Sequence, residues 1–533
     1  MPANGAERGA PGPSSGLRSR TAPHARRGPW LLGALALFVS GCAVGPDFKS
    51  PEPPAAAQGT SNFTPFPLPE QMASADVPGG AQQHFRSGQE IQGEWWTMFR
   101  SDVLDQLIRA ALAQNPNVAS AQAALRQAQQ SLAAQNGALR YPNVGLQAQV
   151  ERQRTPVLTE EGAIPFEYTT NSVGLSVSYQ LDLFGGNRRT LEGLAAAVDY
   201  QRFQLEGTYL TLVSNVILTA IQEASLRAQL KTTLEVLDLQ KKSLDVVRVQ
   251  FNAGAIAKSV LLTQQTEVAQ TEATVAPLQK GLSQARHQLA IYLGRLPNEL
   301  GIPEFDVGSL QLPEELPVSL PSALVRQRPD IRASEALLHQ ASAQVGVATA
   351  ALYPQVNLSA TYGSGAAKVG DLFDSSSIVW NALAGLTQPV FNGGALTAKK
   401  RAAEAAYDQS AANYRSTVLD AFKDVADALR AVEYDATTMR AQAQAEALAA
   451  ESLKISAEQY KLGAVAYLQL LEAQRAYSQA RIALVQAQAA RFSDTVALYQ
   501  SLGGGWWNQS AMADVSRPGS EGTIERPTLA PVQ

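Results

Sequence analysis

Side chains that could act as nucleophiles, metal ligands or acid–base catalysts are scarce in this chain of 533 residues. It contains one cysteine and four histidines, and only His84, His287 and His339 lie beyond residue 41. No cluster of His, Cys, Asp or Glu has the spacing of a metal site, and no glycine-rich phosphate loop follows a predicted strand. The sequence therefore predicts no enzymatic activity, no cofactor and no metal.

The single cysteine, Cys42, ends a segment with the pattern of an export signal. Five arginines precede a short apolar core at residues 30–40, and Gly41 comes directly before the cysteine. This core is shorter than the roughly 20 apolar residues of a membrane-spanning helix. One cysteine cannot form a disulfide within the chain, so Cys42 needs another role.

The sequence VSGC at residues 39–42 resembles the lipobox of bacterial lipoproteins. The resemblance implies that residues 1–41 are a lipoprotein signal peptide, and that Cys42 is acylated with fatty acids such as palmitate and begins the mature chain. The alternative is an ordinary signal peptide with a chance cysteine. Ala43 stands where an aspartate would mark retention in the inner membrane, which implies the outer membrane. Loss of residues 1–41 lowers the formal charge from -4 to -8, which argues against a nucleic-acid partner.

An internal repeat organises the chain beyond residue 90. Four marks recur in the same order at offsets of 207 to 213 residues: Asn115-Pro116 and Arg328-Pro329, Phe184-Gly185 and Phe391-Asn392, Gly254 and Gly463, Leu293-Gly294 and Leu502-Gly503. Each half is predicted to contain a helix, a strand pair, a very long helix, a glycine break and a returning helix.

These marks divide the chain into predicted segments. Residues 42–92, rich in Pro, Ala and Gln, are expected to form a lipid-anchored extended linker without a core. The repeats are expected at 93–294, with a hairpin near 142–184, and at 329–503, with a hairpin near 354–390. A proline-rich connection covers 295–328, and a flexible tail covers 504–533.

The strand pairs show strict alternation. Val173, Leu175 and Val177 alternate with serine and glycine, and residues 143–151 and 355–362 repeat the pattern. The fourth strand, near 378–388, alternates less cleanly. We expect strands of about ten residues, the length that crosses a bilayer at a tilt. A soluble sheet with one solvated face is the alternative reading.

Four strands cannot cross a membrane alone, because their unpaired edges would leave backbone N–H and C=O groups in hydrocarbon. The sheet must therefore close with strands from other copies of the chain. Two, three or four copies would give eight, twelve or sixteen strands.

The helices show coiled-coil spacing, and the glycines mark their reversal. Val418, Phe422, Val425, Leu429 and Val432 are spaced 4, 3, 4, 3. A helix over 190–250 would be about 90 Å long, too long for a globular core. At Gly254 and Gly463 the chain must turn back, which requires a residue that tolerates positive φ.

The sequence resembles the outer-membrane factors of tripartite efflux systems, the TolC/OprM-like channels. The resemblance is carried by Cys42 with VGPDF at 44–48, by GEWWTMFRSDVLDQLIRAALAQNP at 93–116, by the repeat, and by YKLGAV with LQLLEAQ around Gly463. It implies a homotrimer, mainly α with a transmembrane β part: a 12-stranded β-barrel in the outer membrane, continued by a long periplasmic α-helical barrel. A periplasmic adaptor and an inner-membrane pump driven by protons are the implied partners. The channel is expected to be a passive exit duct for drugs or other small toxic compounds.

The resemblance also implies two functional regions. The residues of the tip motif would dock the adaptor: Gly254, Ala255, Leu462, Gly463 and Ala464. A periplasmic gate would lie above the second tip, with Leu468 and Glu472 one helical turn apart on one face and Tyr460 helping to hold it closed. Val260 and Gln469 replace acids found in some relatives, so we expect the gate to close more by Leu468 than by charge.

Two other functions remain open from the sequence. A channel of the same fold could export proteins instead of small molecules. A lipid-anchored periplasmic coiled-coil scaffold without a pore is the third possibility, although the alternating strands argue against it.

Overall fold

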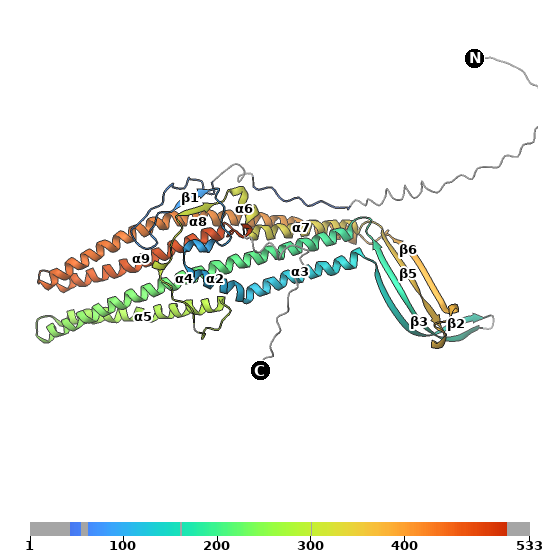
Figure 1. The fold of residues 1–533 in the computed structure, drawn as a ribbon, viewed down its shortest axis with the longest axis horizontal. Helices are drawn as coiled ribbons and strands as arrows, with labels where there is room; N and C mark the ends of the chain where they lie inside the picture. The colour runs from blue at the N-terminus through green and yellow to red at the C-terminus, as the bar shows by residue number, and fades with distance from the viewer. Residues whose placement is uncertain (1–42, 55–61, 160–161, 300, 509–533) are drawn as a thin grey trace, which may run out of the picture.

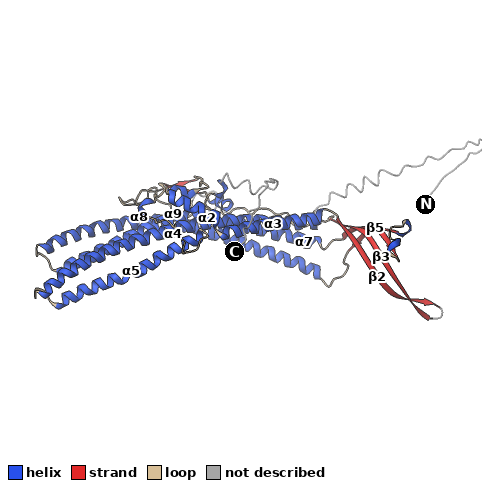
Figure 2. Ribbon diagram, turned by 60° about the horizontal axis from the view of Figure 1, so that its bottom comes forward, coloured by secondary structure: helices blue, strands red, loops and turns tan. Residues whose placement is uncertain are grey.

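The computed structural model describes residues 43–54, 62–159, 162–299 and 301–508. Cys42, the predicted signal peptide 1–41 and the tail from residue 509 lie outside the described residues. The chain is elongated: long helices form the body, and four strands leave one end of it at an angle (Figure 1). Figure 2 shows the same division, with the helical hairpins ending far from the strands.

Both halves use the same elements in the same order. The first half comprises α2 (Asp102–Gln114), α3 (Pro116–Arg140), β2 (Asn143–Thr159), β3 (Gly162–Leu181), α4 (Gly186–Asn252) and α5 (Lys258–Tyr292). The second comprises α6 (Pro321–Gln327), α7 (Pro329–Ala350), β5 (Gln355–Ala366), β6 (Ile378–Thr387), α8 (Ala395–Lys461) and α9 (Tyr467–Ser501). Helices α4 and α8 each have 67 residues and α5 and α9 each have 35, which confirms the two-fold repeat.

The punctuation of the sequence explains where these helices begin. Asn115 caps α3, its side-chain oxygen accepting a hydrogen bond from the Asn117 N–H at 2.8 Å, and Pro116 occupies the first turn. Pro329 likewise occupies the first turn of α7. Among the described residues, no helix combines the length and the apolar character needed to cross a membrane.

The four long strands form one antiparallel sheet in the order β2-β3-β5-β6. The register pairs apolar residues with apolar residues across all four strands, for example Leu146 with Leu175, Leu175 with Tyr362, and Tyr362 with Trp380. Directly paired residues lie on one face of a sheet, so the alternation read from the sequence becomes a continuous apolar face. The opposite face carries Gln147, Ser176 and Thr361.

The expected strand length of about ten residues is wrong for the first hairpin. Strands β2 and β3 have 17 and 20 residues, whereas β5 and β6 have 12 and 10. The apolar alternation ends near residue 151, but backbone pairing continues from Glu151 with Thr170 to the hairpin turn. Backbone hydrogen bonds require no particular side chains, so the polarity pattern underestimated these strands.

The main hydrophobic core lies at mid-length, where both repeats meet. Ile217 and Ile221 of α4, Val425 and Leu429 of α8, and Phe492 of α9 are all buried there. Trp95, in a short 3-10 helix at Trp95–Phe99, stacks on Tyr499 with ring centroids 5.1 Å apart. The expected coiled-coil positions of α8 thus form core contacts.

The connection between the repeats is tied to the first helical hairpin by a buried carboxylate. Glu223 of α4 is fully buried. It accepts hydrogen bonds from the Phe305 N–H at 3.1 Å and from Arg227 at 2.5 Å, and Arg286 of α5 lies 3.4 Å away. This network holds the connection, around residue 305, against α4 and α5.

The segment expected to be an extended linker is wrong in part. Within it, Met72 and Ile91 are buried in the main core, and β1 (His84–Ser87) pairs in parallel with β4 (Glu315–Val318). Arg491 of α9, fully buried, donates hydrogen bonds to the carbonyl oxygens of Gly79 and Ala81 at 3.0 and 2.7 Å and to Gln83 at 3.2 Å. Isolated apolar residues in a proline-rich stretch have no periodicity, so their burial was not predictable from local pattern.

The expected start of the flexible tail at residue 504 is also wrong for its first residues. Gly504 and Gly505 are buried with positive φ. Trp506 Nε1 donates to the Gln327 carbonyl oxygen at 2.6 Å, and Asn508 Nδ2 donates to that of Ile91 at 2.7 Å. The chain is therefore fixed to the core through residue 508.

Candidate functional site

Each helical hairpin ends in the same glycine turn. Gly254 and Gly463 have φ of +74° and +70°. At each tip the residue after the glycine closes a bond to the preceding helix, from the Ala255 N–H to the Gln250 oxygen and from the Ala464 N–H to the Gln459 oxygen, both 2.9 Å. This is the Schellman arrangement, in which a β-carbon at the glycine would be strained.

The tips are open surfaces in the protomer. A β-carbon added at Gly254 or Gly463 would meet no atom within 4 Å. Ala255 and Ala464 are exposed, and Leu462 is 84 % exposed. The tip residues therefore present backbone and small side chains, with one leucine, for contact with another molecule.

Leu468 and Glu472 lie on the exposed side of α9, just above the second tip. Leu468 is 56 % exposed and Glu472 is exposed, whereas Leu470 and Leu471 are buried. The two residues are one turn apart on one face. Leu468 is thus not part of the packed wall of its own protomer.

Tyr460, the residue expected to hold the gate closed, contacts the first hairpin. Its hydroxyl donates to Gln250 Oε1 of α4 at 3.4 Å, and its ring meets Tyr467 edge-on with centroids 5.5 Å apart. Burial raises the pKa of Tyr467 to about 12, so this hydroxyl stays neutral at physiological pH.

A second bridge between the hairpins was missed from the sequence. Arg475 of α9 donates through Nε to Glu267 Oε2 of α5 at 2.7 Å, and a second guanidinium nitrogen contacts Oε1. Glu267 is buried, whereas the Arg475 side chain is 43 % exposed, so the pair is shielded from solvent on the side of Glu267 only. Residues 208 positions apart form it, and neither stands in a recognisable motif. The burial of Glu267, which only the structure shows, is the one sign of it.

The residues that follow Cys42 are anchored where the strands meet the helices. The Val44 N–H donates to the Phe184 oxygen at 3.0 Å. Arg189, buried at the start of α4, donates to Asp47 Oδ1 at 2.6 Å. Phe48 stacks on His339 with centroids 4.3 Å apart. Cys42 itself lies outside the described residues.

The histidines do not form a chemical centre. His339 is half-buried and bonded to Glu192 at 2.9 Å. His84 lies near the Glu70 carbonyl oxygen, and His287 is exposed. Across the part of the chain that the structure describes, no group of three or more His, Cys, Asp or Glu is arranged to hold a metal ion.

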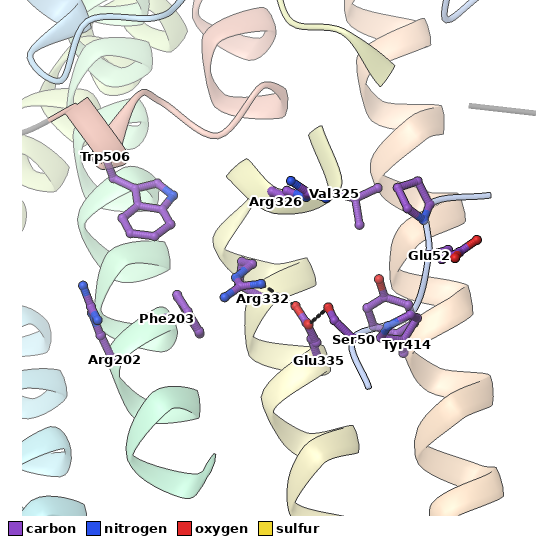
Figure 3. A pocket seen from close by; sticks show the side chains of 12 residues that line it. Ser50, Glu52, Arg202, Phe203, Val325, Arg326, Arg332, Glu335, Tyr414 and Trp506 are labelled. Carbon is purple, nitrogen blue, oxygen red and sulfur yellow. Dashed lines mark hydrogen bonds and ion pairs between the residues drawn. The ribbon is translucent and has the colours of Figure 1, made fainter. Parts of the chain in front are cut away.

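A pocket of about 480 Å³ lies where the N-terminal segment crosses α4, α7 and α8 (Figure 3). Arg332 lies over the Phe203 ring at 5.1 Å and pairs with Glu335 at 2.6 Å. Ser50 also contacts Glu335. The central polar groups of the pocket are thus bonded to one another, and they serve to attach residues 50–53 to the helices.

Comparison with known proteins matches this architecture. The family described as outer membrane efflux protein matches residues 107–295 and 320–504. The pyoverdine export outer membrane protein OpmQ of Pseudomonas putida is 32 % identical over 448 residues, covering 83 % of this chain and 94 % of that protein. The toluene efflux pump outer membrane protein TtgC of Pseudomonas putida is 29 % identical over 488 residues, covering 91 % and 96 %. The cation efflux system protein CusC of Escherichia coli is 29 % identical over 486 residues, covering 88 % and 98 %.

Solved structures agree with the sequence relatives. The outer-membrane channel OprN is similar with a TM-score of 0.77 and 28 % identity, covering 87 % of this chain and all of that one. CusC is similar with a TM-score of 0.73 and 26 % identity, with the same coverage. The fold, the repeat and these matches define an outer-membrane efflux channel.

The chain belongs to the outer membrane efflux protein family. Three copies form its channel: a 12-stranded β-barrel in the outer membrane that continues into an α-helical barrel in the periplasm. Each copy contributes the four strands of its sheet, which closes the edges that a single copy leaves unpaired.

Proposed function

We propose that the channel is the passive exit duct of a tripartite pump for drugs or other small toxic compounds. An inner-membrane pump, driven by protons, supplies the energy, and a periplasmic adaptor joins the two. The observation that carries the proposal is the family match over both repeats. A duct needs no catalytic group, in keeping with the scarcity of such side chains.

The names of the relatives support small cargo rather than secreted protein. They refer to pyoverdine, toluene, antibiotics and cations. Relatives that are about equally similar to this chain are thus named after chemically different compounds. We infer that the pump, and not the channel, selects the compound.

We propose that the two hairpin tips dock the adaptor. The support is geometric: the tips are the ends of the molecule farthest from the strands, and their glycine turns are exposed (Figure 1). Small residues at Ala255 and Ala464 allow another helical hairpin to approach closely. A bulky residue at Gly254 or Gly463 would strain the turn by about 1–2 kcal/mol and crowd this surface.

Docking at the tips is tested by cysteine crosslinking in cells that pump. Ala255→Cys and Ala464→Cys should each crosslink to an adaptor through a short bifunctional maleimide, because both lie at the turn. Leu448→Cys, equally exposed but well up α8, is the matched control and should not crosslink. If neither tip residue crosslinks while drug efflux stays intact, the docking proposal fails.

We further propose that Cys42 carries lipid and anchors the mature chain in the inner leaflet of the outer membrane. The support is the location of the next residue: a β-carbon added at Gly185 would lie 2.6 Å from the Ala43 α-carbon, between the end of β3 and the start of α4. A lipid attached one residue earlier would start at the level where the barrel leaves the membrane. Several acyl chains together give stable attachment.

Mass spectrometry of the mature protein tests this anchor. We expect an N-terminal peptide that begins at Cys42 and carries the added mass of acyl chains. Cys42→Ala should lose that mass and leave the membrane attachment to the barrel alone. An unmodified thiol, or a mature chain that retains residues before 42, would contradict the proposal.

We propose finally that Leu468 and Glu472 form the periplasmic gate, with Tyr460 holding it closed. Their exposure in the protomer supports this, because three copies around one axis would present three leucines and three carboxylates to the pore. The contact between Arg475 and Glu267 adds a second bond between the hairpins, so it serves as a positioning contact for the gate.

A further inference from the structure

The first strand pair extends well beyond the rest of the sheet. Strand β3 pairs with β5 only as far as Asn171 opposite Ala366. From there, residues 151–159 and 162–170 pair only with each other, and we call this segment the outer ribbon. At about 3.3 Å per residue it reaches roughly 30 Å beyond the rim of the sheet. Figures 1 and 2 show it projecting past β5 and β6, away from the helices.

The rim is marked by residues that end the sheet. Asn171 is buried there and donates through Nδ2 to the carbonyl oxygens of Ala366 and Ala367, at 3.3 and 3.0 Å. Val150, which pairs with Asn171, is the last residue of the alternating apolar run on the lipid-facing side of β2. The outer ribbon therefore begins where the membrane-facing surface stops.

The polarity of the two faces reverses at this rim. Below it, the face that carries Leu146 and Val150 is apolar. Above it, the same face carries Arg152 opposite Thr169 and Arg154 opposite Glu167. Glu167 pairs with both arginines, at 3.1 and 3.5 Å. Beyond these charged residues the face carries Pro156 opposite Pro165. The outward face is thus apolar within the membrane and charged directly outside it.

The inward face changes in the opposite sense. Within the barrel it carries Gln147, Gln149 and Ser176, as a water-filled lumen requires. Above the rim β3 carries Tyr168, Phe166 and Ile164 in succession on this face, opposite Gln153, Thr155 and Val157 of β2. A water-exposed ribbon outside the cell would be expected to place polar residues on both faces, so this apolar stripe calls for a covering surface.

Nothing in the described protomer covers this stripe. Phe166, Ile164 and Val157 are 56, 58 and 48 % exposed, and Tyr168 is 39 % exposed. Phe166 and Tyr168 contact each other at 5.8 Å, and the Tyr168 hydroxyl donates to Gln153 at 2.6 Å. These contacts hold the two rings on the inward face but leave their outer surfaces open.

We propose that the three outer ribbons pack these apolar stripes against one another around the trimer axis and narrow the outer mouth of the channel. The partner is a second copy of this chain, because the stripe continues the face of the sheet that points into the lumen. Side chains alternate between faces along a strand, so the direction of that face carries over from the barrel into the ribbon. The charged outward face then meets water and the headgroups of the outer leaflet.

Cysteine pairs on opposite faces test the arrangement. Under mild oxidation in intact cells, Phe166→Cys should form disulfide bonds between two protomers of the same trimer. Glu167→Cys should not. The two positions are adjacent, near the rim, where the twist of a two-stranded ribbon has turned the faces least. Loss of the exposed ion pairs of Glu167 should barely affect folding. The parent protein, whose one cysteine is Cys42, controls for background.

A second measurement tests whether the outer ribbons narrow the outer mouth of the channel. Ser176→Cys, on the lumen face, should react slowly with a bulky polyethylene-glycol maleimide added outside intact cells, and faster when Phe166→Ser and Tyr168→Ser are also present. A small maleimide should label both proteins at the same rate. The proposal is overturned if Phe166→Cys and Glu167→Cys crosslink alike, if neither crosslinks, or if the bulky reagent labels both proteins equally.

Discussion

Replacing Leu468 with serine is expected to raise the resting conductance of the purified channel in planar bilayers. Leu468 is 56 % exposed in its protomer, so the serine leaves no cavity in the helical wall. In the trimer three leucines would form an apolar ring, and such a ring restricts flow by excluding water. A polar ring of smaller side chains should admit water and ions, and cells should leak drug inward.

Glu472→Ala is the second half of this prediction. Three carboxylates near one axis repel one another and attract cations. The alanine should therefore raise resting conductance and also lower the preference for cations over anions. Leu468→Ser should leave that preference almost unchanged, which separates the apolar ring from the charged one.

Matched controls lie on α8. Leu448 is 60 % exposed and Glu451 is exposed, and both belong to the other helix of the second hairpin. Leu448→Ser and Glu451→Ala should give the currents of the parent protein. Unaltered currents in both Leu468→Ser and Glu472→Ala would show that these residues face the outside of the helical barrel, and the gate would have to be sought elsewhere.

Arg491→Met should be the most destabilising single substitution considered. Burial lowers the pKa of Arg491 to about 10, so the side chain is still charged at neutral pH. Its charge is stabilised by three oxygens of the segment around residue 80 and not by a carboxylate. Methionine fills a similar volume but leaves those oxygens without a donor, at a cost of about 3–5 kcal/mol.

The loss of stability in Arg491→Met should affect the segment around residue 80 as well as the whole protein. With residues 79–83 released, trypsin should cut faster after Arg86, and the thermal midpoint of the purified trimer should fall. Arg481→Met is the matched control on the same helix. The Arg481 side chain is 42 % exposed and pairs with Glu446 at 3.3 Å, so its removal should cost little. Equal effects of the two substitutions would refute the role given to Arg491.

Much of the architecture could be predicted because its signals are local. Gly254 and Gly463 need positive φ, Pro116 and Pro329 mark helix starts, and alternation such as that of Val173 and Leu175 follows directly from the pleat of a strand. Each signal depends on a residue and its neighbours along the chain. Because the same signals recur in both halves, the order of the elements could also be predicted.

The contacts that hold these elements together were not predictable in this way. Arg475 with Glu267, Glu223 with the Phe305 N–H, and Arg491 with the segment around residue 80 all join residues far apart in sequence. A charged residue in a helix is usually solvated, so the burial of Glu223, Glu267 and Arg491 could not be predicted from the sequence.

The sequence by itself therefore determined the repeat, the helical hairpins with their glycine tips, and the apolar face of the barrel strands. Only the tertiary structure decided that parts of residues 62–92 and residues 504–508 are attached to the core, and that the first hairpin continues beyond the sheet with its faces reversed. The reason is physical. Secondary structure reflects periodicity along the chain, whereas burial and strand pairing depend on which distant surface is available to meet each residue.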